Sequence, residues 1–475
     1  MKRLLILICL SVVSCTVGPK YSEPRIELPC EWQPEHSEEL TTDSIDCYRW
    51  WESLNDPMLN SLLARASAQN IDLHLAMTRI WEARLSLKGG QASLLPRLDG
   101  SFSYAYASFN QKTLNNILGY GCSHERSSQR NLNLFEAGFD AEWEIDLFGM
   151  NAHQVKALVA MEEASQEDFS NAWVTLSAEV ARSYIELRGF QQRLTVLNKD
   201  LESQRDTQSL TQSLITSGFA GTLDQMQIDE ELSVLLSQKP QLELMIHKNI
   251  HHLSILLGCL PSDLLCELSE PGLLPELPCH RPIGVPSELL RRRPDIRKAE
   301  RELAAATEQV GVAVAALFPR ISLRGFIGDI TTLCTQGSLT GFVSPQLLFP
   351  IFNSRLLEQD VCLNKIKVEQ SLFGYQKTVL GALEETENAI ASFHYELERN
   401  RHLEAAMNFS QNAYTQVLQL YQNGMRNYLE VQMIHRSYLA AEGAYLQSQI
   451  DLLVNYIALY KALGGGWDVF SCKLE

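Results

Sequence analysis

The longest regular pattern in the chain is a helical one between residues 151 and 216. Its apolar side chains recur at a mean spacing close to the period of a coiled-coil seam. They are Phe169, Trp173, Leu176, Val180, Tyr184, Leu187, Phe190, Leu194, Leu197 and Leu201. A helix of about 66 residues would be about 100 Å long, far more than one globular core can cover. The pattern therefore predicts a tall helical wall.

Alternation with a period of two predicts strands near 94–109 and 131–147. The second strand alternates apolar residues with the carboxylates Asp140, Glu142, Glu144 and Asp146, and the first strand alternates aromatics, Phe102, Tyr104 and Tyr106. A soluble sandwich can carry acids on its outer face. Four successive acids opposite aromatic side chains are more typical of a membrane β-barrel with lipid outside and water inside. This second interpretation predicts that the four acids line the barrel lumen.

The chain contains two copies of one unit. Leu95-Pro96-Arg97 recurs as Phe318-Pro319-Arg320, and the Gly218 break recurs at Gly424, 206 residues later. Copy one comprises helical stretches at 57–90, 151–216 and 222–257 around its two strands. Copy two comprises helical stretches at 286–317, 354–421 and 427–462, with strands near 319–330 and 340–352. Four strands cannot close a barrel, so closure requires an oligomer.

Proline positions divide the chain. None occurs at 97–239 or 351–475, whereas six of the 17 lie between Pro261 and Pro286. We therefore predict a first repeat at 56–257, a Pro-rich linker or equatorial region at 258–285, a second repeat at 286–465 and a C-terminal tail at 466–475. Asp56-Pro57 is typical of the start of a helix, and Pro240 predicts a kink.

The N-terminus has the pattern of an export signal. Lys2 and Arg3 precede the apolar run Leu4–Val13, which ends in Ser14-Cys15. This order is typical of a lipoprotein signal, so we expect residues 1–14 to be removed, Cys15 to be acylated and residues 15–55 to form a lipidated N-terminal segment. The alternative is an ordinary secretory signal in which the cysteine falls by chance.

Composition and charge argue against several classes of protein and kinds of site. The formal net charge of −17 argues against general nucleic-acid binding, and a mean hydropathy of −0.11 argues against a polytopic helical membrane protein. An odd number of cysteines remains after Cys9 and Cys15, so they cannot all pair internally. His247, His251 and His252 have a spacing that could bind a metal, but no following Glu completes that motif, and an exposed polar face explains them better. We predict no enzyme, no cofactor and no metal.

Three motifs carry a family resemblance. They are Cys15-Thr-Val-Gly18-Pro19-Lys-Tyr21, Trp50-Trp51 followed by Asp56-Pro57, and the stretch from Pro286 through Arg291-Arg292-Arg293-Pro294-Asp295-Ile296-Arg297 to Glu300. With them the chain resembles the TolC-like outer-membrane channel factors, in the lipoprotein branch that serves resistance-nodulation-division multidrug pumps. The last stretch continues through Phe318-Pro319-Arg320, and this long order makes the resemblance specific.

The resemblance implies a mainly α-helical homotrimer. Four strands from each chain would close a twelve-stranded outer-membrane barrel, and the helices would continue it as a long periplasmic helical barrel with a belt at its waist. The implied function is an outer-membrane channel subunit of a tripartite efflux system for drugs or other small toxic compounds. Its implied partners are a periplasmic membrane-fusion adaptor, an inner-membrane pump and outer-membrane lipid.

The family's control point is the periplasmic tip, where the helices turn. By resemblance, Tyr421, Arg426, Leu429, Glu430 and Arg436 lie at this constriction. Met433 stands where the family usually carries an Asp, and Glu430 is the candidate replacement. We hypothesise that Asp224 and Glu430 form an acidic ring that shuts the channel to anions. Alternatively, both acids simply begin helices, where negative charge is favourable.

Two other functions remain open at this stage. One is the exit duct of a type I protein secretion system, against which lipidation and the Arg-rich stretch argue. The other is a periplasmic coiled-coil scaffold lipoprotein, against which the alternation of acids and aromatics at 139–146 argues.

Overall fold

The computed structural model describes residues 16–26, 29, 32, 49–110, 129–218, 221–278, 285–332 and 338–467. The expected signal peptide, Cys15 and most of the expected tail lie outside these residues. The chain divides into two compact units. Unit 1 comprises Met1–Pro24, Trp81–Glu163 and Glu300–Phe373, and unit 2 comprises Arg25–Ile80, Ala164–Ala299 and Gly374–Glu475.

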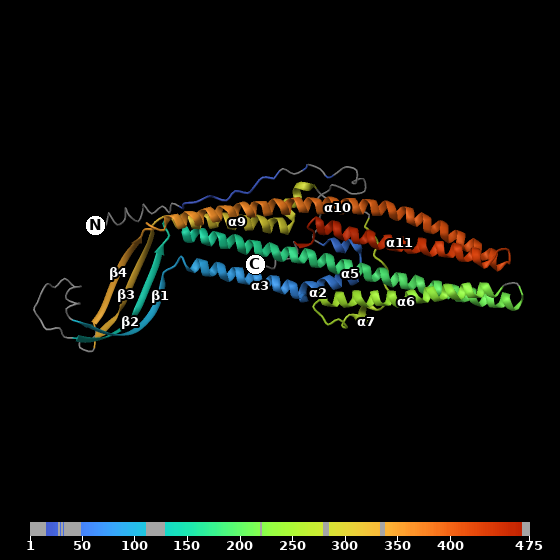
Figure 1. The fold of residues 1–475 in the computed structure, drawn as a ribbon, viewed down its shortest axis with the longest axis horizontal. Helices are drawn as coiled ribbons and strands as arrows, with labels where there is room; N and C mark the ends of the chain where they lie inside the picture. Colours follow the sequence, from blue (N-terminus) through green and yellow to red (C-terminus); the bar gives the residue numbers. More distant parts are fainter. Residues whose placement is uncertain are drawn as a thin grey trace, which may run out of the picture. The chain divides into compact units, whose positions relative to one another are not determined.

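The helices occur in the predicted order in both copies (Figure 1). In copy one they are α2 (Pro57–Gln69), α3 (Ile71–Ala92), α5 (Met150–Thr216) and α6 (Thr222–Leu256), preceded by η2 (Trp50–Leu54). Copy two has η3 (Pro286–Glu288), α8 (Leu289–Arg292), α9 (Pro294–Ala315), α10 (Ser354–Gln422) and α11 (Tyr428–Ala462). The linker contains the short α7 (Leu265–Leu268). Figure 1 shows α6 folding back along α5, and α11 folding back along α10.

The expected stretch at 57–90 is two helices. Its start is confirmed, because Asp56 Oδ1 accepts hydrogen bonds from the Met58 and Leu59 amides and Pro57 is the first helical residue. The break comes at Asn70, whose side chain accepts from the Leu73 amide and donates to the Leu256 carbonyl. The second contact belongs to α6, so no local pattern could have revealed it. Helix α6 itself continues through Pro240.

A four-stranded antiparallel sheet lies in unit 1 (Figure 1). Its strands are β1 (Arg97–Asn110), β2 (Gln129–Ile145), β3 (Arg320–Thr332) and β4 (Ser338–Leu348), in the order β1-β2-β3-β4. Asp140 lies opposite Asp99 and Phe326, and Glu142 lies opposite Arg97 and Arg324. Directly opposed residues share a face, so this register determines the composition of both faces.

An aromatic cluster in unit 2 joins residues from the early and the late parts of its sequence. The rings of Trp51 and Trp173 meet edge to face at 6.0 Å, and Trp50 stacks on Tyr460 at 5.9 Å. Trp173 also donates its indole hydrogen to the Gly466 carbonyl at 2.8 Å. Contacts of this kind contribute beyond their buried area. The cluster therefore fixes the chain ends against α5 and α11.

The irregular segments of unit 2 bind to the long helices through side-chain donors. Buried Arg188 on α5 donates to the Glu270 carbonyl, and Gln191 donates to the Leu268 carbonyl. Buried Arg293 donates to the Ala462 carbonyl at 2.8 Å and forms ion pairs with Asp295 and Glu385. The Arg-rich stretch is thus structural in this region, since one of its arginines fastens the end of α11.

In unit 1 the segment after Cys15 is docked on α5 and α9. His153 Nε2 lies 3.1 Å from the Val17 carbonyl oxygen, and its Nδ1 lies 2.5 Å from Glu308 Oε2. Tyr21 donates to Glu300 at 2.5 Å. A Cβ on Gly311 would come within 2.6 Å of the His153 ring, so the approach of this ring requires a glycine there.

None of the helices within the described residues is both long enough and apolar enough to cross a membrane.

Replacing Arg293 with Met should lower the thermal stability of the helical unit. The substitution removes the ion pairs to two carboxylates and leaves the Ala462 carbonyl with only the longer 3.3 Å hydrogen bond from Thr386, which should cost about 2 kcal/mol. Thermal unfolding followed by circular dichroism measures the change. Arg291→Met is the matched control, because Arg291 is exposed and adjacent in sequence. Equal effects of the two substitutions would contradict a fastening role for Arg293.

Candidate functional site

The two faces of the sheet differ sharply in polarity. Asp140, Glu142 and Glu144 share one face with Ser101 and Arg324. Ser101 donates to Asp140 at 2.5 Å, and Arg324 forms an ion pair with Glu142 at 2.9 Å. The opposite face carries exposed apolar side chains from all four strands, which are Leu98, Phe102, Phe139, Trp143, Ile327, Leu339, Val343 and Leu347. Exposed fractions of 77% for Phe102 and 79% for Leu339 mean that the described residues of the chain leave this face uncovered.

The charged face also contains a buried aromatic. Phe326 is 5% exposed and stacks on Phe342 at 5.9 Å. A Cβ on Gly138 would come within 2.6 Å of the Phe326 ring, and one on Gly328 within 2.7 Å. Because the two glycines have no side chains, the ring packs directly against the sheet backbone. An aromatic ring over a glycine is a known way of stabilising glycines in strands.

Asp146 differs from the other three acids. Strand β2 ends at Ile145, not at 147 as expected, and Asp146 accepts a hydrogen bond from the Ala152 amide at 2.7 Å. Helix α5 begins at Met150, so this contact satisfies a free amide of its first turn. The alternation of acids thus continues one position beyond the strand, where Asp146 binds the first turn of α5.

The second group of expected residues lies where the helices turn. Gly218 and Gly424 adopt positive φ angles of 79° and 72°, as expected for glycines that end helices. Beside the second turn is a groove of about 790 Å³. Its lining includes four of the expected residues, Asp224, Tyr421, Arg426 and Glu430. The fold therefore brings them together from both helix pairs.

Each acid at the turns also has a local partner. Asp224 accepts from the Gly221 amide at 3.0 Å at the start of α6, and Glu430 accepts from Arg426 at 2.8 Å in the first turn of α11. The helix-start interpretation thus has direct support. It does not exclude the acidic ring, because both side chains also line the groove.

The remaining expected residues behave differently from one another. Tyr421 is buried and shares a 2.7 Å hydrogen bond with Thr211, which joins α10 to α5. Burial raises the pKa of its hydroxyl. Leu429 is exposed, as is Met433. Arg436 binds Glu230 of α6 at 2.9 Å in an exposed ion pair and is not part of the groove lining.

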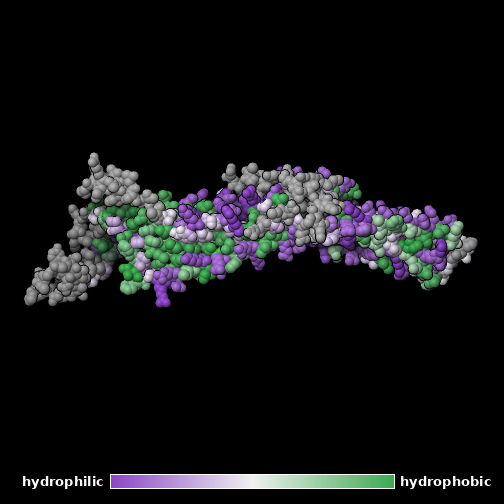
Figure 2. All heavy atoms as spheres, turned by 90° about the horizontal axis from the view of Figure 1, so that it is seen from above, coloured by the Kyte–Doolittle hydropathy of each residue, from purple (hydrophilic) through white to green (hydrophobic). Residues whose placement is uncertain are grey.

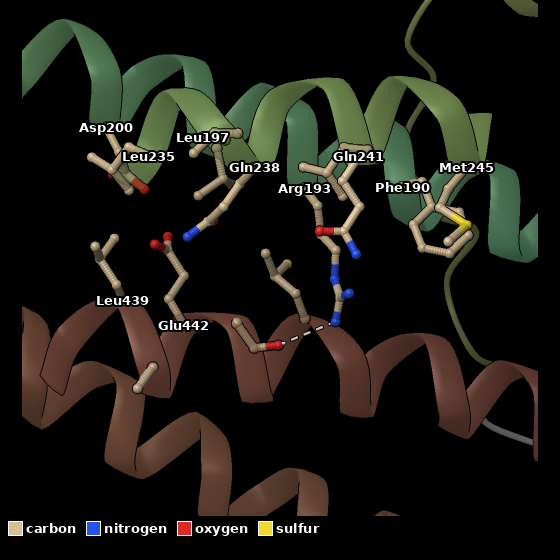
Figure 3. Close-up of a pocket in the computed structure, with 15 residues that line it drawn as sticks. Phe190, Arg193, Leu197, Asp200, Leu235, Gln238, Gln241, Met245, Leu439 and Glu442 are labelled. Atoms are coloured by element: carbon tan, nitrogen blue, oxygen red, sulfur yellow. Dashed lines mark hydrogen bonds between the residues drawn. The ribbon is translucent and has the colours of Figure 1, made fainter. Parts of the chain in front are cut away.

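A cavity that the sequence did not reveal lies between α5, α6 and α11 (Figure 3). It has a volume of about 680 Å³ and carries Asp200 and Glu442 on facing sides, with Phe190 and Met245 toward its other end. Burial and the nearby Glu442 raise the pKa of Asp200 to about 6, while His435 acts in the opposite direction. The sequence of α5 alone could not predict the raised pKa of Asp200, because the groups around this side chain come from two other helices.

The described residues contain no group of three or more His, Cys, Asp or Glu side chains placed to hold a metal. The rings of His247 and His251 lie 6.2 Å apart. Cys259, Cys266 and Cys362 are free thiols, while Cys15, Cys30 and Cys47 lie outside the described part of the chain.

Comparison with known proteins identifies the family. The family model described as outer membrane efflux protein matches residues 62–258 and 285–465. The chain belongs to the outer membrane efflux protein family. The pyoverdine export outer membrane protein OpmQ of Pseudomonas aeruginosa is 30% identical to it over 476 residues, which cover 98% of this chain and 97% of OpmQ.

Two further comparisons agree over nearly the full length. Nodulation protein T of Rhizobium leguminosarum bv. trifolii is 28% identical over 458 residues, covering 96% of this efflux protein and 95% of the relative. A solved structure of the outer-membrane channel OprN superposes with a TM-score of 0.87 at 32% identity, covering 95% of this chain and 100% of that chain. The efflux protein is therefore an outer-membrane channel subunit that extends into the periplasm, and its relatives are channel and transport proteins.

Replacing Asp200 with Asn should stabilise the efflux protein near neutral pH. A raised pKa means that the folded state favours the neutral acid, so the charged carboxylate destabilises the fold above about pH 6. As pH falls from 6 toward 4, the folded wild type takes up this proton before the unfolded chain does, and the difference shrinks. After allowance for partial exposure, the gain should be about 1 kcal/mol at pH 7.5 and about 0.3 kcal/mol near pH 4.5.

Thermal unfolding of the two proteins at both pH values measures this difference. Asp206→Asn is the control, because Asp206 is exposed on the same helix. A gain from Asp200→Asn that is the same at both pH values would show that ionisation is not its cause.

Proposed function

We propose that three copies of this efflux protein assemble into one channel through the outer membrane, with the charged sheet face toward water and the apolar face toward lipid. The observation that carries this proposal is the sheet itself. Its apolar face is exposed, its opposite face carries Asp140, Glu142 and Glu144, and its outer strands β1 and β4 each have one unpaired edge in the described sheet.

The unpaired edges support assembly on physical grounds. Inside lipid every backbone N–H and C=O group must be satisfied, so an open sheet edge is not tolerated there. Pairing β4 of one copy with β1 of the next would remove all open edges. Four strands from each of three chains give the twelve-stranded barrel that the family resemblance implies, which is within the range of membrane barrels.

The helices of unit 1 offer a second contact surface. Leu356, Leu363, Ile366 and Phe373 are exposed on α10 at heptad spacing, and hydrophobic surface gathers in this part of the molecule in Figure 2. Such a stripe is typical of a coiled-coil seam, and no described part of the chain covers it. A neighbouring copy would cover it and continue the wall of the channel.

The partners follow from the class of system. We propose a periplasmic membrane-fusion adaptor and an inner-membrane pump, with acylation of Cys15 as an additional anchor. The cargo class we propose is small molecules, supported by the full-length similarity to a relative named for pyoverdine export. The two repeats, 56–257 and 286–465, would then each supply two strands and one helix pair to every third of the channel.

We propose that the aperture lies at the helix turns. Asp224, Tyr421, Arg426 and Glu430 line one groove there, with Leu429 exposed close by and Arg436 paired to α6. We propose that this region constricts the resting channel and that the acids Asp224 and Glu430 repel anions at it.

Assembly is tested by membrane fractionation and electrophoresis. The full-length protein should be found in the outer-membrane fraction and should run as an SDS-resistant trimer that dissociates on boiling. A periplasmic scaffold would be released from the membrane fraction by removal of the lipid anchor, so a Cys15→Ala protein that no longer associates with membranes would contradict the barrel.

Replacing Glu430 with Gln should increase the permeability of the channel to anions relative to cations. Each trimer would lose three negative charges at the constriction, which weakens the electrostatic barrier. Planar-bilayer reversal potentials in a salt gradient measure the ratio. Glu243→Gln removes an exposed acid from α6 as the charge-matched control. An unchanged ratio in the Glu430→Gln channel would rule out the acidic ring.

A further inference from the structure

A carboxylate lies inside the helical wall, close to the turns. The Glu231 side chain on α6 is 4% exposed, and acids are almost never buried to this extent unless they are paired. Its Oε1 lies 3.2 Å from Nδ1 of His435, and its Oε2 accepts from the Tyr428 hydroxyl at 3.3 Å. Both partners belong to α11, so the carboxylate joins α6 to α11.

The same cluster reaches the other two helices. Gln204 of α5 donates to the Tyr428 hydroxyl at 2.8 Å, and the His435 ring stacks on Tyr414 of α10 at 4.5 Å. Gln204, His435 and Tyr428 are all buried. Apolar side chains such as Ile228 and Val431 pack beside the cluster, and in such surroundings a charged contact is stronger than at a surface.

We propose that Glu231 and His435 form a proton-dependent tie between the two helix pairs, and that loosening of this tie frees α11 to move away from α6. This inference rests on the proposed aperture at the turns. Tyr428 directly precedes Leu429 and Glu430, and His435 directly precedes Arg436. Glu231 and His435 therefore act on the aperture residues from outside the groove, while their partner Tyr428 is part of its lining.

The atoms facing His435 give the direction of the pH dependence. Its Nδ1 faces Glu231, so with this nitrogen as the donor the exchangeable proton is the one on Nε2. Loss of that proton preserves the hydrogen bond and removes the positive charge beside the buried carboxylate. The tie is therefore stronger when the imidazole carries both protons, and it weakens when a rise in pH removes one of them.

Other titratable groups surround the ring on every packed element. Tyr414 faces it from α10, Asp200 acts on it from α5, and Tyr428 lies two turns earlier on the same face of α11. Farther along α11, Tyr438 donates to Glu442. Asp200 ionises at about pH 6 and so overlaps the range of interest, which requires a pH series in the Asp200→Asn background as well.

Hydrogen–deuterium exchange on the full-length trimer tests the tie. Glu231→Gln and His435→Gln preserve size and hydrogen-bonding capacity but remove the charge and the titration. We expect amides of residues 428–437 to exchange about tenfold faster than in the wild type in either variant at about pH 6. The double variant should exchange no faster than each single variant, because both substitutions break the same contact. In the wild type, protection corrected for intrinsic exchange should fall between about pH 6 and pH 8.5, whereas in His435→Gln it should not.

A neighbouring ion pair provides the control. Glu230 and Arg436 join the same two helices one residue away from the tie, but their side chains are 56% and 55% exposed. Replacing Arg436 with Gln breaks this pair and leaves Glu230 to accept from Gln432 at 3.2 Å. The exchange should change by less than about twofold and keep its pH dependence, since exposed pairs contribute little.

Channel conductance separates this inference from the aperture itself. If the tie controls the aperture, wild-type conductance rises from about pH 6 to pH 8.5 and the His435→Gln channel shows no such rise. Coupled, pH-dependent exchange without a matching change in conductance would support the tie and show that the aperture lies elsewhere. Additive effects of the two substitutions, or pH-independent wild-type protection, would overturn the tie.

Discussion

The apolar face of the four-stranded sheet is the constraint on which the rest of the structure depends. Side chains as large as Phe102, Phe139 and Leu339 are exposed on it, while the opposite face carries carboxylates and Arg324. The apolar face is poorly solvated by water, and the charged face is poorly solvated by lipid. The sheet therefore needs lipid on one side and water on the other. Strands β2 and β3 are paired on both sides, whereas β1 and β4 are paired on one. One chain is thus an incomplete part of a closed structure.

The helical wall uses a different chemistry in different places. In unit 2 the long helices meet through apolar clusters, such as Leu197, Leu201 and Leu235. Near the turns the contact between helix pairs becomes polar, with Glu231, His435, Gln204 and Tyr428 all buried. Buried polar groups contribute less net stability than apolar packing but specify one geometry and respond to proton uptake. Such contacts would suit the proposed aperture, which must hold one position and then leave it.

The irregular parts of the chain are fastened by side chains of the long helices. Arg188, Gln191, Trp173 and Arg293 each donate to a backbone carbonyl in or beside a loop. Carbonyls in loops have no partners in regular structure, and leaving them buried and unpaired would be costly. The Pro-rich linker and the C-terminal end thereby gain defined positions without forming a core of their own.

Periodicity alone determined much of this protein. The near-3.5 period predicted the first long helix to within a residue, and the period of two predicted the charged face and the strands, with errors of up to four residues at the strand ends, because each period follows from backbone geometry. The break at Asn70, the end of β2 before Asp146, the surroundings of Asp200 and the burial of Glu231 were decided only by the tertiary structure. Each depends on groups brought together from distant helices or from the next element, and a pattern read along one segment contains no information about such partners.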